Sequence, residues 1–267
     1  MPYAKVNEIN MYYEIHDEGE PYILISGMGG NVEGERQGIP YYAPEYQKIV
    51  FDKRGAGKTD KPDIPYSIEM MADDLSGLMD YIGIESAHIR GTSNGGMIAL
   101  NFILKYPKRV RSLTLACTTC TGKQGGSPKL REIFSSFMQG NYTQKEMLIE
   151  LATISVTDKY KEANPEFVNI IINSIGNDSS TDHVWRRYIE AQAEHDVCDR
   201  LHEIQVPTLI VSGDSDEVIP VKNAKLMASK IPNSELVIFK DTGHMMIESV
   251  GEVTSICLDF LRRNSKK

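Results

Sequence analysis

One stretch of this sequence decides the fold: Gly91-Thr92-Ser93-Asn94-Gly95-Gly96. It follows a short strand-like run, Ala87–Arg90, and leads into Asn94–Lys105, which carries apolar residues on nearly every side. A helix that is apolar all round is a buried one, so we expect a strand, a tight turn and a buried helix. Glycine at positions 91 and 95 removes side chains that would clash in such a turn. The Ser93 hydroxyl then projects at the N-terminus of the helix.

Short apolar runs alternate with longer amphipathic ones along the chain. The expected strands are Tyr3–Glu8, Met11–His16, Tyr22–Ser26, Ile49–Asp52, Ala87–Arg90, Val110–Ala116, Thr208–Ser212 and Leu236–Phe239. The first two should form a hairpin that turns near Ile9-Asn10. The clearest amphipathic helix is Ser67–Ile82, with Ser67 as its cap and Gly83 after its end. This alternation predicts an α/β fold with a mostly parallel, doubly wound, eight-stranded sheet.

The alternation stops between about Thr118 and Asp196, where helical patterns appear without a convincing strand. Four apolar stripes mark the expected helices: Leu130, Ile133, Phe134 and Phe137; Met147, Leu148, Leu151 and Ile154; Phe167, Val168, Ile171 and Ile175; Val184, Trp185, Tyr188 and Ile189. The strand pattern resumes at Val206. We therefore expect a core made of residues 1–117 and 197–267, and a helical cap (lid) inserted at 118–196.

Composition excludes several classes of protein. The 267 residues include 29 Lys and Arg against 37 Asp and Glu, a net charge of −8, whereas nucleic-acid binders are normally basic. The apolar runs fall far short of the roughly 18 residues of a membrane span, and the N-terminus lacks a basic segment followed by an apolar core. We expect no nucleic-acid or membrane partner and a cytoplasmic location.

The four cysteines, Cys117, Cys120, Cys198 and Cys257, are too sparse for a disulfide scaffold and fit a reducing compartment. Cys117-x-x-Cys120 together with Cys198-x-x-x-His202 has ligand spacing that is too loose for a convincing zinc site. The sequence therefore predicts neither a bound metal nor a cofactor.

A serine hydroxyl is a poor nucleophile at neutral pH and needs a base, usually histidine. Of the histidines, only His244 lies in a loop directly after an expected late strand, in Asp241-Thr242-Gly243-His244. Catalytic groups of open α/β sheets gather beyond the carboxyl ends of the parallel strands, so His244 should lie near Ser93. The other histidines considered fall in an expected strand or in or beside helical segments: His88, His183, His195 and His202.

A carboxylate should orient the histidine and stabilise its charged form. The segment Gly213-Asp214-Ser215-Asp216-Glu217, after the strand Thr208–Ser212, offers three candidates, of which we favour Asp216. The chain order Ser93, Asp216, His244 is the order found in α/β-hydrolases rather than in chymotrypsin or subtilisin.

Outside the cap, nearly the whole chain resembles the α/β-hydrolase-fold family of serine hydrolases, in its esterase- and lactonase-like branch. The resemblance rests on Gly91–Gly95, Gly213-x-x-Asp216-x-x-x-Pro220, Gly243-His244 and Asp52-Lys53-Arg54-Gly55-Ala56-Gly57. In that family the acid lies three residues after the glycine, which supports Asp216 over Asp214. The resemblance also implies that Asp52, Arg54, Gly55 and Gly57 shape a loop rather than react.

An oxyanion hole should combine the N–H group of Asn94, the residue after the nucleophile, with one from the loop after the third strand. That loop is Ser26-Gly27-Met28-Gly29-Gly30, and the resemblance implies that Met28 supplies the second N–H group. The sequence departs from the family here, because Ser26 stands where histidine is often found before Gly27.

The sequence therefore predicts a cofactor-free serine hydrolase of the carboxylesterase type (EC 3.1.1) that acts on small-molecule esters or lactones through an acyl-enzyme. The alternatives are hydrolysis of enol-lactones, then of C–C bonds in diketone-type compounds or of thioesters. Serine in the tight turn argues against dehalogenase and epoxide hydrolase branches, which by resemblance use aspartate there. A rival of another class is a ligand-binding or signalling protein of this fold with slow turnover.

Overall fold

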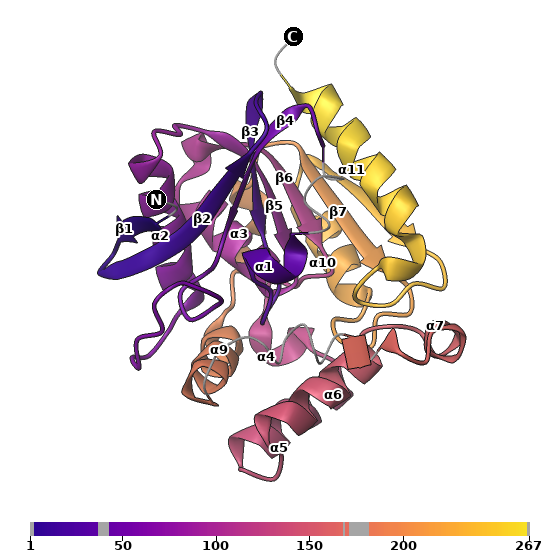
Figure 1. Ribbon diagram of the computed structural model, residues 1–267. Helices are drawn as coiled ribbons and strands as arrows, with labels where there is room; N and C mark the ends of the chain where they lie inside the picture. Colours follow the sequence, from indigo (N-terminus) through magenta and orange to yellow (C-terminus); the bar gives the residue numbers. More distant parts are fainter. Residues whose placement is uncertain (1–2, 37–42, 168, 171–181, 266–267) are drawn as a thin grey trace.

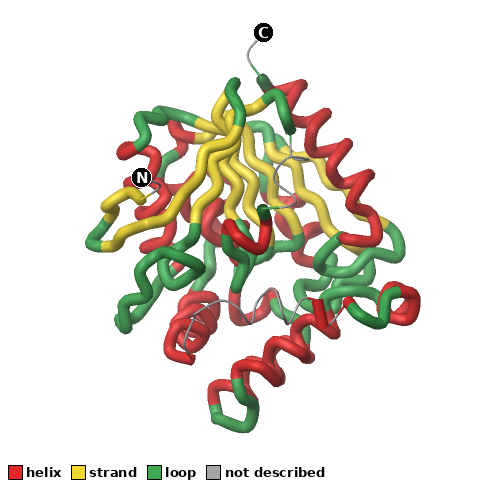
Figure 2. Tube along the Cα trace, in the orientation of Figure 1, coloured by secondary structure: helices red, strands yellow, loops and turns green. Residues whose placement is uncertain are grey.

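A computed structural model describes residues 3–36, 43–167, 169–170 and 182–265. Its strands form one eight-stranded sheet in the order β1-β2-β4-β3-β5-β6-β7-β8 (Figure 2). Their bounds are β1 Tyr3–Val6, β2 Ile9–His16, β3 Glu20–Ile25, β4 Tyr46–Phe51, β5 Ala87–Thr92, β6 Val110–Ala116, β7 Thr208–Gly213 and β8 Ser234–Phe239. Strand β2 pairs antiparallel with β1 and β4, and the other pairs are parallel. The expected fold class is confirmed.

The hairpin between β1 and β2 turns two residues earlier than expected. Val6 pairs with Ile9, so the connecting residues are Asn7 and Glu8 rather than Ile9 and Asn10. Asn7 and Glu8 have φ angles of 42° and 67°, and two successive positive φ angles make the type I′ turn that suits the twist of a hairpin. Ile9 lies in the hydrophobic core, which explains why it belongs to the strand.

Helices cover both faces of the sheet (Figure 1). The core helices are α1 Val32–Glu35, α2 Ile68–Tyr81, α3 Asn94–Lys105, α10 Lys222–Lys230 and α11 Val250–Asn264, with 3₁₀ turns at Pro107–Arg109, Cys198–Glu203 and Ile247–Ser249. Helices α2, α3 and α10 share one hydrophobic cluster with the sheet, and α11 packs on the opposite face. As expected, the Ser67 hydroxyl caps α2 by accepting from the Met70 N–H group at 3.0 Å.

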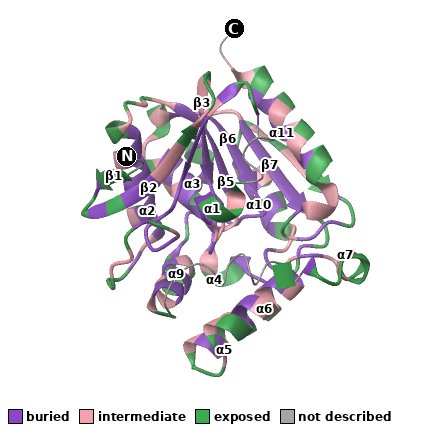
Figure 3. Ribbon diagram, in the orientation of Figure 1, coloured by how far each residue is buried: buried purple, intermediate pink, exposed green. Residues whose placement is uncertain are grey.

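Burial follows from this layering. Figure 3 shows the central strands as buried along most of their length, and all six residues of β7 are buried. A strand covered on both faces needs apolar residues at successive positions, which is why Leu209-Ile210-Val211 is a continuous apolar run. In the described part of the chain, no helix is long and apolar enough to cross a membrane.

The helices of residues 118–196, called the cap below, lie beyond the carboxyl ends of the parallel strands (Figure 1). They are α4 Gly122–Gly125, α5 Pro128–Met138, α6 Gln144–Ile154, α7 Asp158–Ala163 and α9 Asp182–Glu194. Three of the four expected apolar stripes lie on α5, α6 and α9. Most of the remaining stripe, Val168, Ile171 and Ile175, lies outside the described residues. The division into core and cap at 118 and 196 stays a prediction.

The two ends of the cap are joined side by side. Thr121 forms an antiparallel bridge with Asp196. The Gly122 N–H group donates to the His195 carbonyl at 2.7 Å, and the Val197 N–H group donates to the Cys120 carbonyl at 2.9 Å. The chain therefore leaves and re-enters the core through one short two-stranded ribbon.

A disulfide between Cys120 and Cys198 closes this ribbon. The expectation that all four cysteines are reduced is therefore wrong for this pair, whereas Cys117 and Cys257 are free and buried. The two sulfurs are 78 residues apart in sequence and meet only because the ribbon places the two cap ends together. Paired sulfurs cannot act as thiolate ligands, so the loose zinc pattern has another explanation.

We predict that the disulfide stabilises the fold. Closing a long loop typically contributes about 2–4 kcal/mol, so reduction with a phosphine, or the double change Cys120→Ala and Cys198→Ala, should lower the free energy of unfolding by that order in urea titrations. The reductant should leave the double variant unaffected. Titration of four thiols, rather than two, in the unfolded but unreduced protein would contradict the pairing.

We also predict a pH-dependent stability from His195. Burial lowers the pKa of His195 to about 4. Between pH 6.5 and 4 the ring is therefore protonated in the unfolded chain but neutral in the folded protein, so the free energy of unfolding falls as the pH falls. Between pH 7.5 and 5 this linkage removes about 2 kcal/mol. The wild type should therefore lose more stability over this interval than His195→Gln in urea titrations, while His202→Gln, at an exposed position, should follow the wild type. If the free energy of unfolding falls equally with pH in the wild type and in His195→Gln, the prediction is contradicted.

Candidate active site

The turn between β5 and α3 holds Ser93 in an unusual backbone conformation. Its φ and ψ angles are 52° and −119°, a sparsely populated region that costs on the order of 1–3 kcal/mol for a residue with a side chain. A Cβ atom on Gly95 would lie 2.1 Å from the Ile25 carbonyl oxygen, and one on Gly91 would lie 2.4 Å from the Gly95 oxygen. Larger residues at 91 or 95 would force the backbone apart, so close packing maintains the turn.

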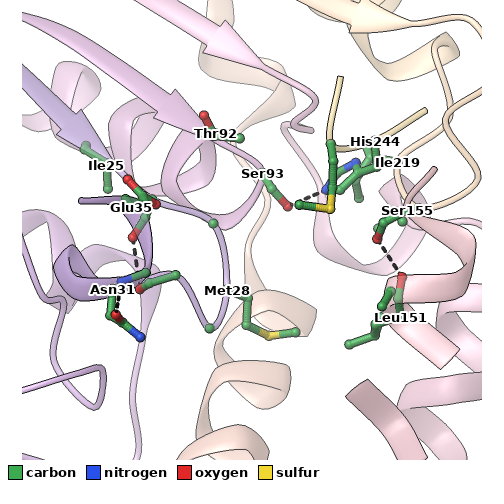
Figure 4. A pocket seen from close by; sticks show the side chains of 18 of the residues that line it. Ile25, Met28, Asn31, Glu35, Thr92, Ser93, Leu151, Ser155, Ile219 and His244 are labelled. Carbon is green, nitrogen blue, oxygen red and sulfur yellow. Dashed lines mark hydrogen bonds between the residues drawn. The ribbon is translucent and has the colours of Figure 1, made fainter. Parts of the chain in front are cut away.

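Ser93 and His244 point toward each other at the carboxyl edge of the sheet (Figure 4). The Ser93 Oγ atom lies 3.0 Å from His244 Nε2, and His244 Nδ1 lies 2.8 Å from Asp216 Oδ2. The three groups come from the segments that follow β5, β7 and β8. Their side chains thus form one continuous hydrogen-bonded relay.

Of the two aspartates that follow β7, only Asp216 reaches the histidine. Its side chain is fully buried, and its second oxygen, Oδ1, accepts from the N–H groups of Val218 and Ile219 at 2.8 Å each. Three hydrogen bonds to the carboxylate fix its orientation. Asp214 is exposed and accepts only a local bond from the Ser215 hydroxyl.

A buried thiol lies behind this relay. Within the described residues, the one group of His, Cys and acidic ligand atoms close enough to hold a metal is Cys117, Asp216 and His244, all within 4.8 Å of one another. Burial raises the pKa of the Cys117 thiol well above its ordinary value, so the sulfur stays protonated, and a thiol must lose its proton to bind a metal. Asp216 and His244 are also bonded to each other, so this group suits a relay better than a metal site.

The loop Ser26–Gly30 lies beside the serine. A Cβ atom on Gly27 would lie 3.5 Å from the Cβ atom of Ser93. Among the described residues, no hydrogen bond engages the backbone N–H groups of Met28 and Asn94, so both remain able to donate to a ligand.

A buried lysine holds this loop in place. The Lys53 ammonium donates to the Ser26 carbonyl at 3.0 Å, the Ser26 hydroxyl at 2.7 Å and the Gly27 carbonyl at 2.9 Å. Three acceptors compensate for burying the charge. Lys53 lies inside the 52–57 motif, but no local pattern predicts its role, because only the folded chain shows which carbonyls it reaches.

Cap helix α9 also contacts this loop. A Cβ atom on Gly29, whose φ is 77°, would lie 2.6 Å from Cη2 of Trp185, so the indole ring occupies the space that glycine leaves. About two turns further along α9, the Gln192 amide lies 2.9 Å from the Met28 sulfur. The spacing pattern marks Trp185 only as an apolar position, and nothing in the sequence marks Gln192 as a contact to this loop.

A cavity of about 430 Å³ opens above Ser93 and His244 between sheet edge and cap. Its cap side is mostly apolar, lined by Leu130, Phe134, Leu148, Leu151, Ala152 and Trp185 together with the polar Ser155 and Gln192. On the other side of the serine lie Asn31 and Glu35 (Figure 4), and Arg90 also lines the cavity. Of the histidines in the described residues, only His244 lines it.

The remaining motif residues hold loops together, as the resemblance implied. The Asp52 carboxylate accepts from the N–H groups of Val32 and Lys58 at 2.7 Å each. Arg54 forms a buried bidentate pair with Asp74, both bonds 2.8 Å long. Gly55 and Gly57 have positive φ angles of 84° and 47°.

Comparison with known proteins agrees with this architecture. A model of the alpha/beta hydrolase fold family matches residues 21–249. A putative carbamate hydrolase, RutD, from Azorhizobium caulinodans is 31% identical over 250 residues, covering 88% of each chain. A 2-hydroxy-6-oxo-6-phenylhexa-2,4-dienoate hydrolase from Comamonas testosteroni is 26% identical, covering 98% of this chain and 96% of that one.

Among solved structures, Est816, described as an N-acyl homoserine lactone degrading enzyme, superposes with a TM-score of 0.84 and 29% identity, covering 97% of this chain and all of that chain. The family model spans most of the sequence, and the sheet order and flanking helices agree with it. The chain belongs to the α/β hydrolase fold family.

Proposed function

We propose that this α/β hydrolase is a serine hydrolase that cleaves carboxylic esters of small molecules through an acyl-enzyme, without a cofactor. The observation that carries the proposal is the hydrogen-bonded relay from Asp216 through His244 to Ser93, with the serine facing a cavity. A serine hydroxyl, a histidine within hydrogen-bond reach and a carboxylate that orients the ring are the parts that nucleophilic acyl transfer requires.

In the first half of the reaction, Ser93 Oγ attacks the ester carbonyl carbon while its proton passes to His244 Nε2. Asp216 keeps the proton of the ring on Nδ1 and stabilises the imidazolium. The carbonyl oxygen becomes an oxyanion that accepts from the N–H groups of Met28 and Asn94, an interaction typically worth several kcal/mol in the transition state. As the intermediate collapses, His244 gives its proton to the leaving alkoxide oxygen, and the alcohol departs.

Water then completes the cycle. His244 takes a proton from a water molecule whose oxygen attacks the acyl-enzyme carbonyl, and the same two N–H groups donate to the second oxyanion. Collapse returns the proton to Ser93 and releases the carboxylic acid. Each proton that leaves an oxygen is returned by the same nitrogen, so the relay ends in its starting state.

The relatives suggest which neighbouring reactions to compare. They include proteins described as a putative carbamate hydrolase, a dienoate hydrolase and an N-acyl homoserine lactone degrading enzyme. Hydrolysis of enol-lactones or of C–C bonds in diketone-type compounds therefore remains the alternative reaction at the same relay. The cavity of about 430 Å³ suits a small molecule. A cytoplasmic location stays a prediction.

We predict that ester hydrolysis depends on Ser93. The change Ser93→Ala should reduce turnover of a p-nitrophenyl ester by at least about a thousand-fold, because removal of the nucleophile leaves only binding and the oxyanion donors. A fluorophosphonate should label the wild type at Ser93, as read by mass spectrometry. The exposed Ser229→Ala variant serves as the control and should retain both properties.

Two results would contradict this proposal. Unlabelled Ser93 together with unchanged hydrolysis in Ser93→Ala would exclude Ser93 as nucleophile. Labelled Ser93 without turnover across esters, lactones and diketones would instead support the slow-turnover ligand-binding protein considered above.

We predict that Asp216, and not Asp214, supports the histidine. Asp216→Asn keeps the size of the side chain but disturbs the ring tautomer, which in such relays costs up to about 10⁴-fold in kcat. Asp214→Asn is the matched control and should stay close to wild type, because its side chain is exposed and does not contact His244. Steady-state kinetics on the same ester checks both variants, and the reverse pattern would overturn the assignment.

A further inference from the structure

The cavity has two chemically different ends. Toward the cap its walls are mostly leucine and aromatic side chains, with Ser155 and Gln192 as the polar exceptions, whereas on the opposite side of Ser93 lie Asn31 and Glu35 (Figure 4). Arg90 also lines the cavity, and its charge acts on Glu35. Figure 4 shows Glu35 and Asn31 on one side of Met28 and Ser93, with Leu151 and Ser155 on the other. An entirely apolar substrate would leave the polar end without a matching group.

The backbone of Glu35 is held firmly. The side chain of Asn31 caps the short helix α1 by accepting from the Gly34 N–H group at 2.8 Å, and the Glu35 N–H group donates to the Asn31 carbonyl at 3.1 Å. These local bonds fix the direction in which the Glu35 side chain leaves the helix.

The carboxyl group of Glu35 lies against the Ser26–Gly30 loop. A Cβ atom on Gly30 would lie 3.0 Å from Glu35 Oε1 and 2.8 Å from the Ser26 Cβ atom, so the glycine leaves room for the carboxyl oxygen. Lys53 binds the same loop through Ser26 and Gly27. The carboxyl group therefore neighbours the loop that we propose to hold the substrate carbonyl.

The surroundings of Glu35 decide what it can bind. Among the hydrogen bonds and ion pairs of the described residues, none engages its carboxyl oxygens. Burial raises its pKa, the positive charges of Lys53 and Arg90 oppose that rise, and the negative charge of Asp52 adds to it. Those two cations disfavour a cationic ligand group, and a carboxyl group disfavours an anionic one. A neutral group that donates a hydrogen bond satisfies both conditions.

We propose that Glu35 is a specificity-determining residue whose carboxyl group hydrogen-bonds a neutral donor, a hydroxyl or an amide N–H, on the substrate. Substrates would then be esters that carry such a group near the reacting carbonyl, with an apolar portion toward the cap. The inference rests on the proposed function and names the substrate class for the same site. A site built to hydrogen-bond a substrate group discriminates against analogues that lack it, because the buried partner is left unpaired.

Two matched pairs of substrates test the proposal. Ethyl 3-hydroxybutyrate, as each enantiomer, is compared with ethyl butyrate to place the hydroxyl in the acyl half. Likewise, 2-hydroxyethyl butyrate is compared with propyl butyrate to place it in the alcohol half. Acid release in a pH-stat gives kcat/KM for each ester. In the wild type the hydroxylated member should be preferred by about tenfold in one of the two pairs.

The variants then assign the preference to Glu35. Glu35→Leu removes the hydrogen-bonding group and should bring the ratio within the preferred pair close to one. Glu35→Gln keeps an acceptor oxygen and should retain part of the preference. Glu33→Gln, at an exposed position on the same helix, is the matched control and should keep the wild-type ratio. If Glu35→Leu does not fold, as judged by circular dichroism, Glu35→Ala replaces it.

The outcomes separate this inference from the proposed function. A wild-type ratio near one in both pairs, or an unchanged ratio in Glu35→Leu or Glu35→Ala, would overturn the role of Glu35. Persistent hydrolysis of ethyl butyrate by Ser93→Ala would instead overturn the proposed function. If Glu35→Leu loses the preference for the hydroxylated ester while hydrolysis still depends on Ser93, both the role of Glu35 and the proposed function are supported.

Discussion

The close packing of the turn around Ser93 is the constraint on which the rest of the site depends. The positive φ of Ser93 is tolerable only because Gly91 and Gly95 let β5, β3 and the start of α3 approach one another without intervening side chains. Ser93 also donates its N–H group to the Ala116 carbonyl at 2.8 Å, which ties the turn to β6. Strain at one residue is thus held by rigid neighbours on three elements, and this places the hydroxyl at the sheet edge.

Buried hydrogen bonds also position the groups around Ser93, namely the Asp216 carboxylate and the Ser26–Gly30 loop. Two backbone N–H groups orient Asp216, and the Lys53 ammonium holds the Ser26–Gly27 carbonyls. Such contacts reduce the freedom of the groups before a substrate arrives, which is what electrostatic preorganisation requires. The proposed oxyanion loop depends on a cation that belongs to the core of the protein and not to the substrate.

The cap contributes more than a cover. Trp185 fills the space beside Gly29, and Gln192 contacts Met28, so helix α9 touches the loop next to the serine. The two ends of the cap are joined by backbone bonds and by the Cys120–Cys198 disulfide. A cap anchored at its base and in contact with the loop can define both the shape of the cavity and the position of the loop.

The sequence by itself determined the strands, the two main helices, the order of Ser93, Asp216 and His244 and the inserted helical segment. These depend on local periodicity, on glycine at a tight turn and on the shared edge at which parallel strands end, all of which are properties of short segments. Only the tertiary structure decided that Lys53 binds the Ser26 loop, that Glu35 lines the cavity and that Cys120 meets Cys198. The local sequence pattern predicts the hairpin turn at Ile9-Asn10, whereas the turn lies at Asn7-Glu8, because burial of Ile9 in the core extends the strand. Contacts between residues tens of positions apart arise from the path of the whole chain, and no local pattern encodes them.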